Sequence, residues 1–465
     1  MGRLGNSMKL FPQVSGVSPI IAIFALTWGL YFSLLAILPI HYPSGEYRNS
    51  LILLVTYVVV TLATALCAEI AARTSSDSKP PEIAPALRPL DHHELERLVL
   101  VGLLFSCIGV LSLAYVRLFV QGIDYSRGLA VARELWNAEG ADRSDISSLW
   151  SIPGYGFGFF FFASTFIAHL HWEQLRPNVR RALLTVALLL VAAHSVLSGG
   201  RSVLLTQLIS IAAAAATRRS QGKRAFPGRF WLTFLAAVIV LFGAGGYFLY
   251  IFSERANATG IASDAYAKSM IIYMGGAPTE KFFAIASLPA PLAATTHFGV
   301  IGGAYVTHSA STVASVMEYA SRRGTATFVG ARALLSRIGL ISGADESWVL
   351  AGAFLSLPGA FWYDYGILGV LAIAWLSGIA LAYAARIVRL SSGGGVSLAF
   401  CAAALITAIL SPLISAPDSL AFPFMVLGYV GLAFYSYIVF GRRNWWLVGC
   451  SCTLVATARV DGELR

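Results

Sequence analysis

The sequence predicts an all-α protein: a polytopic transmembrane helical bundle of about ten spans with a large helical loop on its outer side. Hydrophobic residues make up 57% of the chain, charged residues 12%, and the mean hydropathy is +0.71. Soluble domains usually carry about a quarter charged residues. The apolar residues also form long uncharged runs, and basic residues gather between alternate runs. These observations together favour a membrane bundle over a soluble core.

Ten apolar runs approach the roughly 20 residues that an α-helix needs to cross about 30 Å of hydrocarbon. They are Gly16–Ile40, Ser50–Cys67, Leu98–Val120, Leu149–Leu170, Ala182–Leu197, Val203–Ala216, Phe230–Phe252, Tyr365–Ala385, Val396–Leu413 and Phe422–Phe440. The fifth and sixth runs are short and predict a helical hairpin with a tight outer turn. The apolar stretch Trp446–Ala458 is shorter still, which favours a surface position.

Charge placement predicts the orientation of the spans. With both termini cytoplasmic, the inner segments hold 20 Lys and Arg against 9 Asp and Glu, and the outer segments hold 13 against 14. This distribution satisfies the positive-inside rule. The net charge of +10 is therefore a topology signal, and no nucleic-acid partner is expected.

The predicted organisation has four parts. Residues 1–252 form spans one to seven, 253–364 a large outer loop, 365–440 the last three spans, and 441–465 a cytoplasmic tail. Gly and Pro residues divide the loop into amphipathic stretches, which predicts short helices packed as a cap. These stretches are Ala265–Tyr273, Glu280–Leu288 and Gly299–Ala320, and Phe298–Met317 is a candidate re-entrant segment. A loop of this length is usually functional.

The inner segments carry no recognisable catalytic pattern. The chain has no phosphate-cradling glycine-rich motif and no His or Cys spacing typical of a metal site. Neither a cofactor nor a metal is therefore expected. Any activity is expected on the outer side, where free nucleotides are absent and substrates must arrive already activated.

The sharpest local feature is the turn Ser198–Ser202, which places Arg201 between two glycines and a serine at the outer junction of the two short spans. His194 lies two helical turns earlier, and Arg117 is the other conspicuous ionisable residue within a span. Ionisable groups at membrane depth usually face a cavity or a partner. The alternative is a snorkelling arginine and a histidine bonded to a backbone carbonyl. A guanidinium matches phosphate bidentately, which favours a lipid phosphate or pyrophosphate ligand.

Three further features follow in the outer loop. Glu280 begins a predicted helix, where it either favours the helix dipole or serves as a general base. Asp364 lies where the eighth span begins and would prefer a cationic partner. The loop also carries basic and aromatic residues, most of which are expected to be solvated, paired or interfacial. Those singled out are Arg255, Arg332, Tyr305, His308, Trp362 and Tyr363.

The order of these features resembles the Wzy-type O-antigen and oligosaccharide repeat-unit polymerases, which are related to the O-antigen ligases. The resemblance covers residues 149–430 in layout. It is carried by Gly200-Arg201-Ser202, by Tyr273, Pro278 and Phe282 in the loop, and by Pro358-Gly359 followed by Tyr363-Asp-Tyr-Gly366 and Gly369.

This resemblance implies a GT-C-like, metal-independent glycosyltransferase in the bacterial inner membrane, with its site facing the periplasm. A glycan on undecaprenyl pyrophosphate would be moved onto a new lipid-linked repeat unit, and a chain-length regulator is a candidate partner. The implied roles are pyrophosphate binding by Arg201 and Arg255 or Arg332, proton abstraction by Glu280, His308 or Asp364, and sugar contacts by Tyr273, Tyr305, Trp362 and Tyr363.

Two alternatives stay open. An O-antigen ligase shares nearly all of these features but transfers the finished glycan to the lipid A core. A flippase or transporter without catalysis would instead have broken, paired helices with ionisable groups near the middle of the membrane.

Overall fold

The structure is a computed structural model that describes residues 17–76, 91–128, 131–132, 135, 148–197, 202–227, 243, 245–247, 249–257, 259–318, 326–327, 355–390, 395–418 and 421–440. Nearly all of these residues are helical, as predicted. Within these ranges six helices are long and apolar enough to cross a membrane, so this is a polytopic helical membrane protein. They are Pro19–Ile37, Tyr47–Ala72, His92–Val120, Pro177–Leu197, Leu357–Val388 and Phe422–Phe440. The prediction of about ten spans stays a prediction.

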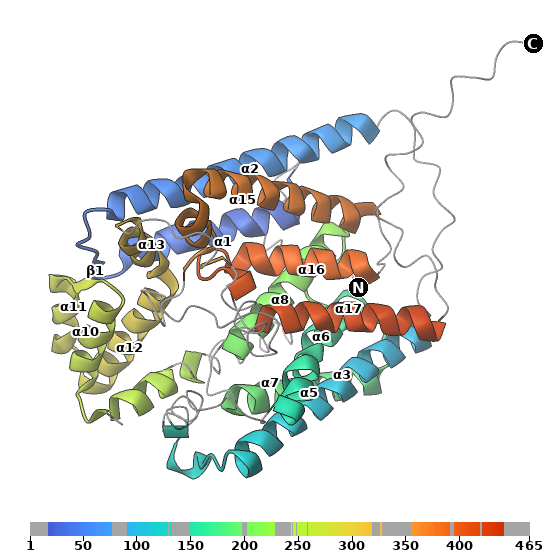
Figure 1. Cartoon of the computed structure of the whole chain (residues 1–465), viewed down its shortest axis with the longest axis horizontal. Helices are drawn as coiled ribbons and strands as arrows, with labels where there is room; N and C mark the ends of the chain where they lie inside the picture. Colours follow the sequence, from blue (N-terminus) through green and yellow to red (C-terminus); the bar gives the residue numbers. More distant parts are fainter. Residues whose placement is uncertain are drawn as a thin grey trace, which may run out of the picture.

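The long elements follow the predicted spans in order. They are α1 (Pro19–Ile37), α2 (Tyr47–Ser76), α3 (His92–Tyr115), α5 (Ser148–Gly158), α6 (Phe160–Leu170), α7 (Pro177–Leu197), α8 (Ser202–Ser220), α15 (Leu357–Leu390), α16 (Gly395–Leu410) and α17 (Ala421–Phe440). The predicted span Phe230–Phe252 lies mostly outside the described residues. Figure 1 shows α1, α2, α15, α16 and α17 side by side, and one large apolar core joins the bundle.

The shorter elements lie between these helices. They are β1 (Ile40–His41), η2 (Tyr125–Arg127), η3 (Trp172–Gln174), α10 (Ser263–Tyr273), β2 (Ala277–Pro278), α11 (Glu280–Ala284), η4 (Ile285–Ser287), α12 (Ala290–Thr307), α13 (Ser309–Met317) and η5 (Ala416–Asp418). A π-helical turn, η1 (Val116–Val120), continues α3.

The predicted span Leu149–Leu170 is divided into two helices. Phe159 separates α5 from α6, with φ −102° and ψ 3°. Pro153 and three glycines lie in α5, and these residue types weaken a continuous helix. Hydropathy alone misses this break, because both halves are apolar.

The predicted short hairpin is longer than expected. α7 begins at Pro177 and α8 continues to Ser220, so each extends beyond its apolar run by several residues at the basic end. Charged residues end the apolar runs, but they do not end the helices, because arginines there find partners at the helix ends. The α7–α8 turn itself, residues 198–201, lies outside the described residues.

Close glycine contacts fix the packing of α3 on α5. A Cβ atom added at Gly109 would lie 2.3 Å from the backbone nitrogen of Gly158. The two backbones therefore touch without intervening side chains, as is common where transmembrane helices cross at small residues.

We expect Gly109→Ala to destabilise the protein by about 1–3 kcal/mol, because the new methyl group has to displace a backbone atom. Gly29→Ala in α1 is the matched control, since an added Cβ there has no neighbour within 4 Å. The midpoint of thermal unfolding in detergent should fall for the first variant and stay unchanged or rise for the second. Equal midpoints would contradict this packing of α3 on α5.

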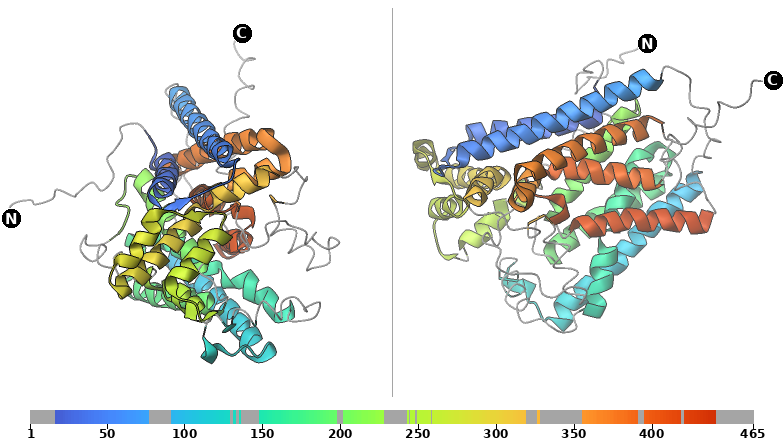
Figure 2. Two further views of the ribbon diagram at one scale, coloured as in Figure 1. Left: turned by 90° about the vertical axis from the view of Figure 1, so that its left-hand side faces the viewer. Right: turned by 45° about the horizontal axis from the view of Figure 1, so that its top comes forward.

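The helices α10, α11 and α12 gather at one end of the bundle (Figures 1 and 2), which we call the cap end. With the helical residues 249–257 they form a small core of their own, and we call this unit the cap. Its core residues are Phe252, Ala256, Tyr266, Ala267, Ile271, Met274, Phe282, Phe298, Val300, Ile301 and Ala304. The short antiparallel pairing of β1 with β2 ties the cap to the segment that follows α1.

The turn between α12 and α13 contacts the side of α1, within the bundle. The hydroxyl of Tyr31, two turns before the last residue of α1, hydrogen-bonds the Thr307 carbonyl (3.2 Å) and the Ser309 hydroxyl (2.8 Å). Ser309 also donates to the carbonyl of Pro412, which follows α16 (2.6 Å). The α12–α13 turn therefore enters the bundle from the cap, in the segment predicted as re-entrant.

Candidate functional site

The predicted loop residues occupy different environments. Glu280 is exposed as the first residue of α11, and Tyr273 is exposed as the last residue of α10. Both flank β2 on the cap. The carboxylate of Glu280 is thus accessible, whereas its position in the first helical turn also suits the helix dipole.

His308 and Tyr305 lie at the α12–α13 turn. His308 is buried, and its Nδ1 lies 2.8 Å from the Tyr305 carbonyl oxygen. The half-buried Tyr305 ring lies 6.2 Å from the ring of Phe252, between centroids. These contacts give both side chains a part in fixing the turn and the cap core.

Asp364 anchors a piece of the loop to the start of α15. Its buried carboxylate accepts hydrogen bonds from the backbone nitrogens of Ala326 (2.9 Å) and Thr327 (2.7 Å), and from the Thr327 hydroxyl. This carboxylate therefore holds hydrogen-bond donors of the loop in place. Trp362 is half-buried beside it, and Tyr363 is buried.

The predicted arginines are only partly described. Arg255 is half-buried in the helical residues 249–257, whereas Arg201 and Arg332 lie outside the described residues. Glu254 precedes Arg255, and one of its carboxylate oxygens lies 3.1 Å from the position that a Cβ atom added at Gly128 would occupy. The residues after η2 therefore contact the helical segment that carries Arg255.

The structure brings together two ionisable residues that come from distant spans. Arg117 lies on the π-helical turn η1 and is 3% exposed. Its Nη1 donates to Gln121 Oε1 (2.7 Å), and its Nη2 donates to the hydroxyl of Tyr155 in α5 (3.2 Å). These bonds orient the guanidinium toward α5. Single π-helical turns often lie at functional sites.

His194 lies near the end of α7 and is 1% exposed. Neither of its ring nitrogens has a hydrogen-bond partner in the described part of the chain. The centroid of the ring lies 4.5 Å from that of Phe159. Its Nε2 lies 3.4 Å from the position that a Cβ atom added at Gly158 would occupy. It thus faces the break between α5 and α6, and α5 also carries Tyr155, a partner of Arg117.

A hydrogen bond from η2 connects this region to the α7–α8 turn. The hydroxyl of Tyr125 donates to the carbonyl of Leu197, the last residue of α7 (3.1 Å). The next residues along the chain, 198–201, include Arg201 and lie outside the described residues. We call this group the arginine cluster: Arg117, Gln121, Tyr125, Tyr155 and His194.

The arginine cluster is suited to bind an anion. The buried guanidinium of Arg117 offers a positive charge in a fixed orientation. The imidazole of His194, whose nitrogens have no partner among the described residues, offers a donor or an acceptor. Sequence reasoning noted both residues as ionisable groups within spans, but only the packing of both against α5 and the residue that follows it makes them one site.

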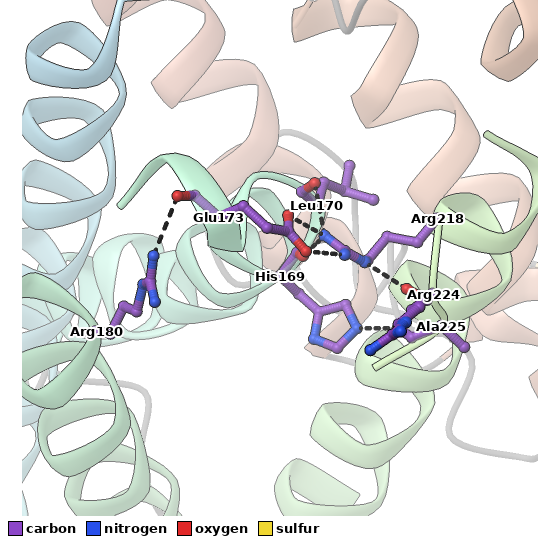
Figure 3. A network of polar contacts seen from close by, with 7 residues as sticks. All are labelled: His169, Leu170, Glu173, Arg180, Arg218, Arg224 and Ala225. Carbon is purple, nitrogen blue, oxygen red and sulfur yellow. Dashed lines mark hydrogen bonds and ion pairs between the residues drawn. The ribbon is translucent and has the colours of Figure 1, made fainter. Parts of the chain in front are cut away.

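At the opposite end of the bundle, Arg218 forms a buried network (Figure 3). Its guanidinium binds the Glu173 carboxylate and donates to the carbonyls of His169 (2.9 Å), Leu170 (3.0 Å) and Arg224 (2.8 Å). It thereby joins the end of α8 to the end of α6. This network satisfies carbonyls that a helix terminus leaves open, so its role is structural.

Two titratable residues near Arg218, His171 and Glu173, lead us to expect a loss of stability in acid. Burial, followed by the nearby charges of Lys223 and Arg218, lowers the pKa of His171 to about 4. The hydrogen bond from Arg218 lowers the pKa of Glu173. Both folded pKa values lie below the unfolded ones, so both contributions are complete above the unfolded pKa and are lost as the pH falls through the folded pKa.

We therefore expect the thermal midpoint to fall between pH 6.5, the ordinary pKa of histidine, and pH 4. His171→Gln should flatten this part of the profile and leave the further loss below pH 4.5, where Glu173 protonates. An unfolding midpoint that is constant from pH 7 to pH 4 would contradict the burial of His171.

No group of three or more His, Cys, Asp or Glu residues that could hold a metal ion occurs among the described residues. No protein-family model, no curated protein and no solved structure matches the chain. The functional interpretation therefore depends on the chemistry of the arginine cluster and on its place at the cap end.

Proposed function

We propose that this protein is a membrane glycosyltransferase that joins polyprenyl-pyrophosphate-linked oligosaccharide repeat units, as an O-antigen or surface-polysaccharide polymerase does. Undecaprenyl pyrophosphate is the proposed carrier, and the periplasmic face of the bacterial inner membrane is the proposed location. The observation that carries this proposal is the buried arginine cluster, which lies at the end of the bundle that charge placement predicts to face outward.

The chemistry of the reaction matches the cluster. The bond between the anomeric carbon and the pyrophosphate oxygen breaks, and a bond forms from that carbon to an acceptor hydroxyl oxygen. Negative charge builds on the departing pyrophosphate, and fixed cations stabilise it. Arg117 would share this role with Arg201 and with Arg255 or Arg332. The donor is already activated, so this route requires no nucleotide.

The proton of the acceptor hydroxyl goes to a base, for which Glu280, His308 and Asp364 are the candidates. Glu280 is exposed, whereas His308 and Asp364 are buried and hydrogen-bonded. Tyr273, exposed beside Glu280, is the most accessible of the proposed sugar-stacking residues. The cap would thus hold the acceptor, while the arginine cluster holds the leaving group.

A second candidate function is supported by a specific observation. The span that is broken at Phe159, with His194 against the break and Arg117 nearby, is the pattern expected of a transporter without catalysis. A lipid-linked sugar flippase would use the same cations to hold a pyrophosphate during translocation. A flippase would have no evident use for the large cap, so we rank the flippase second.

Deletion of the gene separates these possibilities in a bacterium that makes lipid-linked repeat units. Loss of a polymerase leaves lipid A core with at most one repeat unit. Loss of a ligase leaves long chains on the polyprenyl pyrophosphate, and loss of a flippase leaves single units on the cytoplasmic leaflet. Unchanged long chains on lipid A would overturn the proposal. A polymerase phenotype would also justify a search for a chain-length regulator as partner.

A further inference from the structure

The cap contains a long stretch without charge. No Asp, Glu, Lys or Arg occurs between Lys281 and Glu318, although this stretch includes α12 and much of the surface of the cap. Residues 286–292 are exposed in succession and are apolar apart from one serine. An exposed apolar surface of this kind is rarely left in water.

α11 shows how this surface arises. Phe282 is 2% exposed and lies in the cap core, whereas the next residue, Phe283, is 54% exposed, with their ring centroids 5.6 Å apart. One phenyl ring therefore fills the cap and its neighbour points away from it. Further along the chain Leu288 and Leu292 are also exposed, and Ile272 and Tyr273 at the end of α10 are exposed before β2.

The position of this surface is fixed relative to α1. Ile40 pairs with Pro278, His41 pairs with Ala277, and the backbone nitrogen of Thr279 donates to the carbonyl of Pro39 (3.1 Å). These partners lie two to four residues after Ile37, the last residue of α1. At about 3.3 Å per extended residue, β1 lies within roughly 13 Å of the end of the α1 span, and β2 lies about 5 Å beside β1.

The surface of α1 is lipid-facing up to that end. Leu30 and Ile37 are exposed on α1, as expected of side chains that face acyl chains in a polytopic membrane protein. The pairing of β1 with β2 thus holds the start of α11 near the level where α1 leaves the hydrocarbon. Glu280 and Lys281 follow β2 directly, and the uncharged, apolar stretch begins with the residue after Lys281.

We infer that the exposed apolar residues Phe283, Leu288 and Leu292 form a membrane edge of the cap. This membrane edge rests in the headgroup and upper acyl region of the lipid leaflet at the cap end, as an interfacial helix does. Its partner is the lipid surface, because the pairing of β1 with β2 holds the edge near the end of α1, and the exposed side of α1 faces lipid. The inference is independent of the proposed glycosyl transfer.

Such an edge would keep the cap close to the bilayer surface. A substrate with a polyprenyl tail could then reach the space under the cap without leaving the membrane. The exposed charges of Asp264 and Lys268 on α10 lie outside the uncharged stretch and mark the part of the cap that faces water.

Nitroxide labels test this inference in the full-length protein in lipid nanodiscs, with the native cysteines replaced. Labels are placed singly by Phe283→Cys, Leu288→Cys and Leu292→Cys, with Leu30→Cys as the lipid-facing control and Lys268→Cys as the water-facing control. Power saturation then compares collisions with oxygen, which partitions into lipid, and with a water-soluble nickel chelate. We expect oxygen collisions to exceed nickel collisions several-fold at all three sites, as at position 30.

Either of two results would overturn the membrane edge. Nickel accessibility equal to that at position 268 would show a surface in water. Low accessibility to both reagents would show that protein, such as a second copy of this chain, covers the surface. If cysteine variants do not remain monodisperse, Phe283→Trp and Leu292→Trp replace them, and their added fluorescence should be quenched by brominated lipids.

Discussion

Arg117→Ala is expected to reduce polymer formation at least about 10²-fold, because the variant removes a fixed cation from the departing pyrophosphate. The side chain is buried and held by Gln121 and Tyr155, so its charge acts in an environment of low dielectric. The measurement is the distribution of glycan lengths on lipid A in a deletion strain that expresses the variant, compared with the unchanged protein at equal membrane levels.

Two controls separate catalysis from folding in this test. Arg180→Ala removes a cation that lies at the opposite end of the bundle and packs on Trp172, and it should leave chain length unchanged. Arg117→Lys keeps the charge but loses the planar fork that binds phosphate bidentately, so an intermediate effect is expected. If Arg117→Ala is folded and still makes full-length chains, the arginine cluster does not bind the leaving group.

Arg218→Ala is expected to destabilise the protein by about 3 kcal/mol, which is the largest effect on stability that we predict. The side chain is 1% exposed, and its loss leaves three backbone carbonyls of the α6 and α8 ends without their donor. Breaking a buried, charged network by removing one partner typically costs a few kcal/mol. The free energy of unfolding in mixed micelles measures this loss.

Arg224→Ala is the matched control for that measurement. Arg224 contributes its backbone carbonyl to the network and has an exposed side chain, so the truncation leaves the hydrogen bond in place. We expect a change within about 0.5 kcal/mol, as for ordinary surface substitutions. Equal losses in the two variants would show that the region depends on surface charge and not on the buried guanidinium.

Much of the fold follows from hydrophobic patterning. The first two predicted cap stretches correspond to α10 and to α11 with η4, because glycines and prolines mark their ends. The third was predicted to begin at Gly299, whereas α12 begins at Ala290. α7 and α8 were also predicted, but their basic ends were not. A hydropathy argument stops at the first arginine, whereas the helix continues when that arginine, as Arg218 does, finds carbonyls to bind.

The break at Phe159 and the pairing of β1 with β2 lie beyond sequence reasoning. Both halves of the broken span are apolar, so no change of period marks the break. The two-residue strands are joined across more than 200 residues of sequence, and their side chains carry no alternating pattern. Tertiary packing decides both features.

The sequence indicated which types of residue could form the candidate site, but not which of them lie together. Arg117 and His194 stand out because ionisable groups are rare within spans. Their common place beside α5 depends on how α3, α5 and α7 pack, and that packing cannot be predicted from a single sequence. For Asp364, the sequence predicted a candidate base at the start of a span, and the structure adds that this carboxylate holds Ala326 and Thr327 of the loop.

Reconstitution tests the central claim most directly. The purified protein in lipid nanodiscs is given a polyprenyl-pyrophosphate-linked repeat unit as its substrate. We predict a ladder of products that contain two or more repeat units, with one polyprenyl pyrophosphate released per bond formed, and loss of both in Arg117→Ala. A folded protein that binds this substrate but yields neither a ladder nor free polyprenyl pyrophosphate, and that moves it across a liposome bilayer, would contradict the account.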